Sequence, residues 1–162
     1  MKDLIAKDIM NKNVIVAGED MTVQELANLL TANMITGVPV VDETGRLVGV
    51  VSETDIVRTS ASRGRTAAVR ETMESSYYLR GWEDQIDESE LREFHVEEGD
   101  GLMVRDIMTP LIFKVAEDAS IAEMADTMIG GRIHRLIVTN KDIVVGIVTT
   151  LDILKVIRRY AG

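Results

Sequence analysis

Apolar side chains recur at positions i, i+3, i+4 and i+7 in two separate stretches, a spacing that places them on one face of an α-helix. They are Val23, Leu26, Ala27 and Leu30 in the first stretch and Ile121, Met124, Ala125 and Met128 in the second. Each stretch opens on the pattern S/T-x-x-E, at residues 22–25 and 120–123, whose hydroxyl and carboxylate satisfy the free N–H groups of a helix start. The pattern therefore predicts two amphipathic helices with the same start signal.

Short apolar runs rich in β-branched residues surround both helices, and each is typical of a strand. The predicted strands are 14–17, 38–41 and 47–51 in the first half of the chain and 112–115, 136–139 and 144–148 in the second half. A last helix closes each set, and in the second half Ile153, Val156, Ile157 and Tyr160 give it an apolar face. Each half therefore has the order β-α-β-β-α.

The two halves are copies of one unit. The stretch KDIMNKNVIVAGEDMTVQEL at residues 7–26 aligns with RDIMTPLIFKVAEDASIAEM at 105–124, and LVGVVSETDIV at 47–57 aligns with VVGIVTTLDIL at 144–154. A unit this small leaves a sheet face uncovered. We therefore expect an α+β fold in which two repeats, 1–60 and 104–162, pack through their sheets by pseudo-twofold symmetry, with a charged insertion at 61–103.

Composition narrows the possible functions. The chain has 162 residues, of which 46% are hydrophobic, and its 27 acidic residues outnumber the 18 Lys and Arg for a formal net charge of −9. Such a charge repels nucleic acid and anionic membrane. There is no cysteine and no apolar run long enough for a membrane span. We therefore expect a cytoplasmic protein that binds neither nucleic acid nor membrane.

One polar pattern stands at the same place in both repeats, where a predicted strand ends and a helix begins. It is Ser52 with Asp55 in the first repeat and Thr149 with Asp152 in the second. A carboxylate there can accept hydrogen bonds from both hydroxyls of a ribose, while the hydroxyl and the free helix amides suit phosphate oxygens. The alternative is structural, with the hydroxyl capping the helix and the carboxylate complementing its dipole.

Four stretches together resemble the tandem cystathionine β-synthase (CBS) domain pair, or Bateman module. They are DIM, GVPVVDETGRLVGVVSETDIV, RIHRLIV and GIVTTLDIL. The resemblance covers about two thirds of the chain. It implies a non-catalytic regulatory, energy-sensing module that binds AMP, ADP or ATP in clefts between the repeats and commonly forms a homodimer. Alternatives within the resemblance are a sensor of S-adenosylmethionine or an NAD-type ligand, and a ligand-free structural or partner-docking module.

The resemblance also implies roles for a cationic pair in the second repeat. His134 and Arg135 align with Thr36 and Gly37, so the two clefts differ in charge. Arg offers a planar fork that matches phosphate oxygens, and a nearby anion can charge a His near pH 7. The implied first cleft comprises Ser52, Asp55, His134 and Arg135, with Ile112 and Phe113 beside the adenine. The implied second cleft comprises Thr149 and Asp152, with Val14 and Ile15 near the base.

Two features keep other interpretations open. Residues 58–103 are longer than the repeats need, with arginines at 58–70 and mostly acids at 83–100. They are a solvated linker, a docking segment for a regulated enzyme or transporter, or a basic arm for nucleic acid. An enzyme would use Asp55 and Asp152 as acid and base, but the two residues occupy equivalent places in separate clefts. We therefore expect no catalytic residues and no metal site.

Overall fold

The structure is a computed structural model, and it describes residues 4–63, 101–110 and 112–161. Most of the predicted insertion at 61–103 lies outside these ranges. The chain divides into two compact units. The β1–β3 unit comprises Val16–Thr44 and Val48–Leu111, and the β4–β6 unit comprises Met1–Ile15, Gly45–Leu47 and Ile112–Gly162. Each unit is described here by itself.

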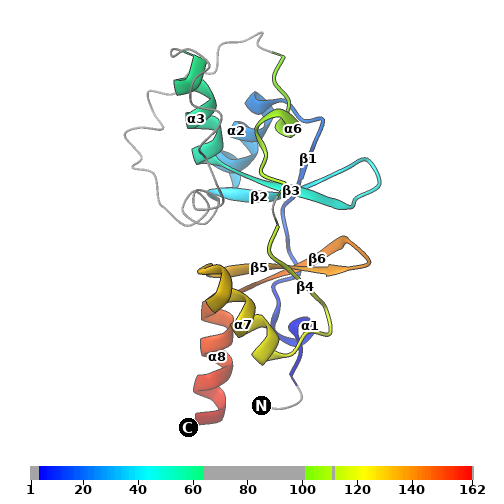
Figure 1. Ribbon diagram of the computed structural model, residues 1–162, viewed down its shortest axis with the longest axis vertical. Coiled ribbons are helices and arrows are strands. Elements are labelled where there is room, and N and C mark those ends of the chain that lie inside the picture. Colours follow the sequence, from blue (N-terminus) through cyan, green and yellow to red (C-terminus); the bar gives the residue numbers. More distant parts are fainter. Residues whose placement is uncertain (1–3, 64–100, 111, 162) are drawn as a thin grey trace. The chain divides into compact units, whose positions relative to one another are not determined.

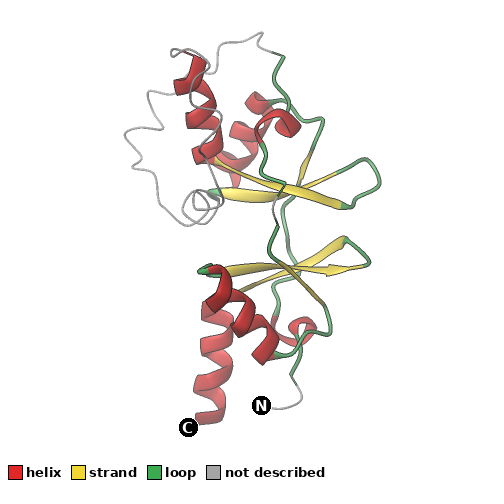
Figure 2. Cartoon of the chain, in the orientation of Figure 1, coloured by secondary structure: helices red, strands yellow, loops and turns green. Residues whose placement is uncertain are grey.

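Each unit contains one three-stranded sheet with helices packed on it (Figures 1 and 2). The elements of the β1–β3 unit are β1 (Ala17–Gly18), α2 (Val23–Asn33), β2 (Gly37–Val41), β3 (Leu47–Ser52), α3 (Glu53–Arg63) and α6 (Val104–Ile107). Its strand order is β1-β2-β3, and β1 runs parallel to β2, with Ala17 opposite Val40.

The β4–β6 unit repeats this arrangement. Its elements are α1 (Ala6–Ile9), β4 (Lys114–Ala116), α7 (Ile121–Gly131), β5 (Arg135–Asn140), β6 (Ile143–Thr149) and α8 (Thr150–Ala161). The strand order is β4-β5-β6, with β4 parallel to β5 and β5 antiparallel to β6. The α+β class and the two similar sheets confirm the fold class predicted from the repeats.

The helix starts predicted from the capping pattern are confirmed. Helix α2 begins directly after Thr22, whose Oγ1 accepts from the Glu25 N–H at 3.2 Å, while the Glu25 carboxylate accepts from the Thr22 N–H at 2.8 Å. Ser120 and Glu123 form the same reciprocal pair at the start of α7. The apolar faces of both helices contribute to the cores, with Leu26, Leu30, Met124 and Met128 buried.

Two sequence predictions are wrong in detail. The first strand of each repeat was expected at 14–17 and 112–115, but β1 and β4 lie about two residues further on. Pairing with the neighbouring buried strand, β2 or β5, sets their position, and this pairing is not visible in the short apolar run itself. The expected apolar face of α8 is also only half covered, because Ile153 and Val156 are buried while Ile157 and Tyr160 are 42% and 55% exposed.

Each repeat contains a short helix that the sequence did not predict, and each of these helices packs in the unit that holds most of the other repeat. Helix α1, at the start of the first repeat, packs in the β4–β6 unit, where the Ala6 N–H donates to the Ala119 carbonyl at 2.8 Å and Asn11 pairs with Ile147. Helix α6, at the start of the second repeat, packs in the β1–β3 unit, and the Val104 N–H donates to the Met21 carbonyl at 2.8 Å. Each unit is thus completed by the opening segment of the other repeat.

The DIM motif has a structural role at both places. Its carboxylate caps the short helix, with Asp8 accepting from the Ile5 N–H at 3.1 Å and Asp106 from the Met103 N–H at 2.9 Å. Its methionine packs against a glycine of the last strand of a sheet, β3 or β6. A Cβ at Gly49 would lie 2.9 Å from Met108 Sδ, and Met10 fills the corresponding space at Gly146.

Over the described residues, no helix combines the length and the apolar content that a bilayer crossing requires.

Candidate ligand-binding site

In the β1–β3 unit, the predicted polar pattern forms a closed hydrogen-bonded turn between β3 and α3. Strand β3 ends at Ser52, whose side chain is buried, with the residue only 3% exposed. The Ser52 N–H and its hydroxyl both donate to Oδ2 of Asp55, each at 2.7 Å. The Glu53 N–H, at the first position of α3, donates to the carbonyl of Thr36 at 2.9 Å. These bonds fix the orientation of the Asp55 carboxylate.

Burial dominates the titration of Asp55. Desolvation raises the pKa of its carboxyl above the ordinary value, because a carboxylate loses hydration when it is buried. The two hydrogen bonds from Ser52 and the charge of Arg58 act in the opposite direction without cancelling the shift. Asp55 is therefore a half-buried carboxyl whose charged form is less favoured than that of a solvent-exposed aspartate.

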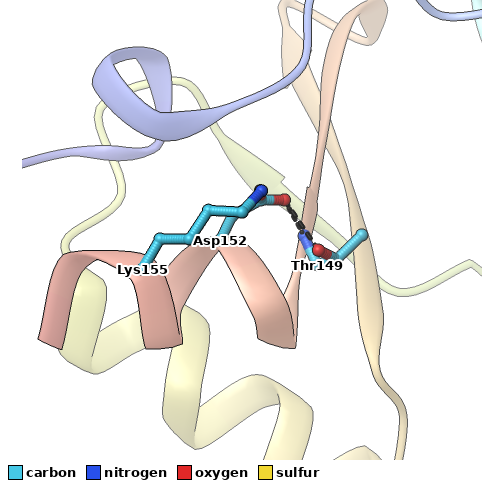
Figure 3. Close-up of polar contacts among 3 residues, drawn as sticks. All are labelled: Thr149, Asp152 and Lys155. Atoms are coloured by element: carbon cyan, nitrogen blue, oxygen red, sulfur yellow. Dashed lines mark hydrogen bonds and ion pairs between the residues drawn. The ribbon is translucent and has the colours of Figure 1, made fainter. Parts of the chain in front are cut away.

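The β4–β6 unit repeats the turn and adds a cation (Figure 3). The Thr149 N–H and hydroxyl donate to Oδ2 of Asp152 at 2.9 and 2.7 Å. Lys155, one turn along α8, donates from Nζ to the other oxygen, Oδ1, at 2.9 Å. Both carboxylate oxygens of Asp152 are thus engaged within the unit.

The pKa of Asp152 moves the other way. Burial on its own would raise it, but the hydrogen bond from Lys155, the two hydrogen bonds from Thr149 and the Lys155 charge together bring the pKa below the ordinary value. The pKa values of two residues at equivalent positions of the repeats are therefore shifted in opposite directions.

The cationic pair His134–Arg135 stands at the same junction as Thr149. Arg135 opens β5 and lies directly opposite Thr149 in the antiparallel ladder, so the two side chains leave the same face of the sheet. The carbonyl of the exposed His134 accepts from the Thr150 N–H at 2.8 Å and from the Thr150 hydroxyl at 3.1 Å. The start of α8 is therefore tied to the segment that carries the pair.

The four apolar residues predicted near the base belong to the β4–β6 unit and are half-buried. They are Val14, Ile15, Ile112 and Phe113. The Phe113 ring lies against Gly131 of α7, where a Cβ would be 2.8 Å from its Cε1 atom. The Phe113 carbonyl accepts from the Ile137 N–H at 3.3 Å. These contacts place Phe113 beside β5, the strand that begins with Arg135.

The structure thus gathers most of the predicted site residues in one unit. The β4–β6 unit holds Thr149, Asp152, His134, Arg135, Val14, Ile15, Ile112 and Phe113, and the β1–β3 unit holds Ser52 and Asp55. The predicted grouping of Asp55 with the cationic pair stays a prediction. Sequence reasoning missed Lys155, although one signal was present, because a basic residue follows the aspartate by three positions in both repeats, as Arg58 and Lys155.

A duplicated α+β unit with a matching hydroxyl–aspartate turn in each copy defines a tandem-repeat protein. The chain belongs to the CBS domain family, since the family model matches residues 6–62 and 104–159.

The chain is similar in sequence to several curated proteins. An uncharacterized protein of Methanocaldococcus jannaschii, MJ1426, is 30% identical over 160 residues, covering 94% of this chain and 90% of the relative. Other curated relatives are longer proteins, of which the chain spans between 11% and 55%.

Two solved structures show the same fold. CBSX2 in complex with AMP has a TM-score of 0.65 at 20% identity, covering 98% of each chain. The CBS domain pair of protein MJ0100, in complex with 5-methylthioadenosine and S-adenosylmethionine, has a TM-score of 0.62 at 24% identity, covering 97% of this chain and 98% of that one.

Proposed function

We propose that the chain is a regulatory module that binds an adenosine-containing ligand, and that Asp55 and Asp152 hold the ribose in their respective units. The observation that carries the proposal is the same hydroxyl–aspartate turn, with the same pair of hydrogen bonds to Oδ2, at the strand–helix junction of both repeats. The caps at Thr22–Glu25 and Ser120–Glu123 have a similar pattern, but their carboxylates are exposed, whereas Asp55 and Asp152 are half-buried just after the end of a strand.

The chemistry of the turn suits a ribose. An ionised carboxylate has two oxygens and about four acceptor positions. The Ser52 or Thr149 bonds use Oδ2, so the two vicinal hydroxyls of a ribose would donate to Oδ1, which in Asp152 also accepts from Lys155. Because the turn already fixes the carboxylate, a ligand pays little to order it. The structural role in capping and the binding role are therefore compatible.

The ligands of the similar structures support the adenosine part of the proposal. AMP, 5-methylthioadenosine and S-adenosylmethionine differ in the 5′ substituent but share adenine and ribose. We place AMP, ADP or ATP first for this chain, because His134, Arg135 and Lys155 stand in one unit with Asp152. S-adenosylmethionine or an NAD-type ligand is the second candidate, favoured by the MJ0100 complex.

Regulation requires that occupancy change something else. A ligand can shift a conformational equilibrium only by its difference in affinity for two states. We propose that the second state is a different arrangement of a homodimer or of a complex with a regulated enzyme or transporter. Small-angle scattering with and without saturating AMP tests this part. Identical scattering profiles for the free protein and for the AMP complex would show that AMP binds without changing the arrangement.

The binding proposal is tested by isothermal titration calorimetry with AMP, ADP, ATP, S-adenosylmethionine and NAD. We expect saturable binding of at least one ligand, weakened in Asp55→Asn, in Asp152→Asn or in both. Asp126→Asn, an exposed acid on α7, is the matched control and should bind as the wild type does. No heat from any ligand with folded protein would overturn the proposal and favour a partner-docking module.

A further inference from the structure

Lys155 forms an ion pair with Asp152, a proposed ribose-binding carboxylate. Its Nζ lies 2.9 Å from Oδ1 of Asp152, the oxygen that the Thr149 bonds leave unused. The Lys155 side chain is 72% exposed, whereas that of Asp152 is 18% exposed, so a well-exposed ammonium bonds a carboxylate that is much less exposed (Figure 3).

We propose that Lys155 is the specificity-determining residue of the β4–β6 unit, and that it selects ligands with an anionic 5′ substituent over neutral or cationic ones. The inference rests on the proposed function, since it assumes that Asp152 holds a ribose. Lys155 competes with every ligand for Oδ1, but only an anionic ligand gives the displaced ammonium a new partner.

The first step is the competition itself. A ribose that donates to Oδ1 needs the position that Nζ occupies. Displacement is feasible because a single ion pair whose lysine side chain is 72% exposed is weak, and the lysine side chain is flexible. It nevertheless has a cost, since the charge-assisted bond is lost, and this cost is the same for all adenosine ligands.

The second step is the fate of the released ammonium. Arg159 stands four residues after Lys155 on α8, so the two like charges are neighbours on the helix surface. Arg135 lies opposite Thr149 in the adjoining ladder. A Lys155 that has lost Asp152 therefore keeps a like-charged neighbour on the helix, Arg159. A 5′ phosphate offsets this charge, whereas a sulfonium adds to it and a neutral 5′ group does neither.

The third step is the contrast with the β1–β3 unit. There, Thr36 and Gly37 replace the cationic pair beside Ser52. The carboxyl of Asp55 is governed first by burial and only last by the charge of Arg58. Charge selection of the kind described for Lys155 is therefore expected in the β4–β6 unit and not in the β1–β3 unit.

The test compares AMP with adenosine by calorimetry in an Asp55→Asn background, so that binding reports on Asp152. We expect AMP to bind more tightly than adenosine, and Lys155→Met to reduce this preference by about tenfold, equivalent to about 1.4 kcal/mol. Adenosine itself should bind more tightly to Lys155→Met, because Oδ1 is released. Lys155→Arg should keep the preference.

Arg58→Met, the substitution at the equivalent position of the other repeat, is the matched control and should leave the preference unchanged. An AMP preference that stays within twofold in Lys155→Met would overturn the inference while leaving the proposed function intact. If the unsubstituted protein binds neither ligand, the proposed function fails as well. If Asp55→Asn disturbs the fold, the Asp55→Asn background is not used. NMR titration of the amide resonances of Thr149 and Lys155 then measures the affinities of this unit for AMP and for adenosine.

Discussion

Asp55 and Asp152 belong to the same sequence pattern, but their pKa values are shifted in opposite directions. Each accepts two hydrogen bonds on Oδ2 from the residue three positions before it. Burial prevails at Asp55 and raises its pKa, while Lys155 and Thr149 prevail over burial at Asp152 and lower its pKa. The difference comes from the surroundings of the turn rather than from the turn itself.

This difference predicts two separate acid titrations. As pH falls, Asp55 should take up its proton above the ordinary pKa of an aspartate and Asp152 below it. Because a protonated carboxyl accepts fewer hydrogen bonds, AMP bound at Asp55 should be lost at a higher pH than AMP bound at Asp152. Carbon-detected NMR of the side-chain carboxyls measures both values. Titration in the reverse order would contradict the assignment.

The same pKa shifts give opposite contributions to stability. Lowering the pKa of Asp152 means that its contacts stabilise the fold above the ordinary pKa, and this contribution is lost as pH falls through the lowered value. Protonation of Asp55 instead relieves the cost of a buried charge. Asp152→Asn should therefore reduce the acid dependence of the free energy of unfolding, and Asp55→Asn should not.

The helix caps make a prediction about single hydroxyls. Thr22→Ala and Ser120→Ala each remove the acceptor for the N–H at the third helix position and should lower the free energy of unfolding by about 1 kcal/mol. Thr31→Ala, an exposed position within α2, is the control and should have little effect. Urea unfolding of the three variants measures the difference, and equal stability of all three would refute the capping role.

Sequence reasoning at the residue scale succeeded where chemistry is local. The Ser or Thr and the Asp of each turn are three residues apart, so their meeting follows from helix geometry. Arg135 and Thr149 are brought together by strand register, which the sequence does not specify. The ion pair of Lys155 with Asp152 is local as well, at a spacing of three residues on one helix, and its signal in the sequence was missed.

At the scale of elements, glycine allows the short helices to dock. A Cβ at Gly49 would lie 2.9 Å from the Thr109 carbonyl oxygen as well as 2.9 Å from Met108 Sδ, and a backbone oxygen cannot turn aside as a side chain can. The glycine in the repeated VGV and VGI stretches is therefore explained by the close approach of the segment after α6 or α1.

Gly49→Val should therefore destabilise the β1–β3 unit by about 1–3 kcal/mol through overpacking. Gly130→Ala is the control, because nothing lies within 4 Å of a Cβ at that position of α7, and it should be neutral or slightly stabilising. Thermal unfolding of the two variants compares them. A Gly49→Val protein as stable as the control would show that the segment does not pack against β3.

The pattern predicted the helices better than the strand ends. In helices α2 and α7, the capping pattern predicts the first residue, and the spacing of the apolar residues predicts the buried face. Strands β1 and β4 contain only two and three residues, and their limits are set by the partners they pair with. The apolar run at 14–17 therefore indicated a strand but not its position.

At the scale of the whole molecule, each compact unit is completed by the opening segment of the other repeat. The sequence could not reveal this exchange. Both repeats contain a DIM segment and a matching glycine, so the alignment alone does not tell which segment pairs with which strand. The sequence repeat therefore predicted two similar units, but it did not indicate in which unit each short helix packs.

Removal of residues 1–13 should therefore weaken the unit that contains the second repeat. We expect the amide protons of β6, which pair with Asn11, to lose hydrogen-exchange protection while those of β2 and β3 keep it. The rest of the first repeat, which directly follows the deletion in sequence, serves as the internal control. Loss of protection in β2 and β3 first would contradict the exchange of segments.

The central claim is that Asp55 and Asp152 hold the ribose of an adenosine ligand, and one calorimetric cycle tests it most directly. AMP and its 2′,3′-dideoxy analogue are titrated into the unsubstituted protein and into Asp55→Asn/Asp152→Asn. We predict that removing both hydroxyls weakens binding to the unsubstituted protein by tenfold or more, since two charge-assisted hydrogen bonds are lost, and has little further effect on the variant. A dideoxy analogue that binds the unsubstituted protein as tightly as AMP would contradict the account.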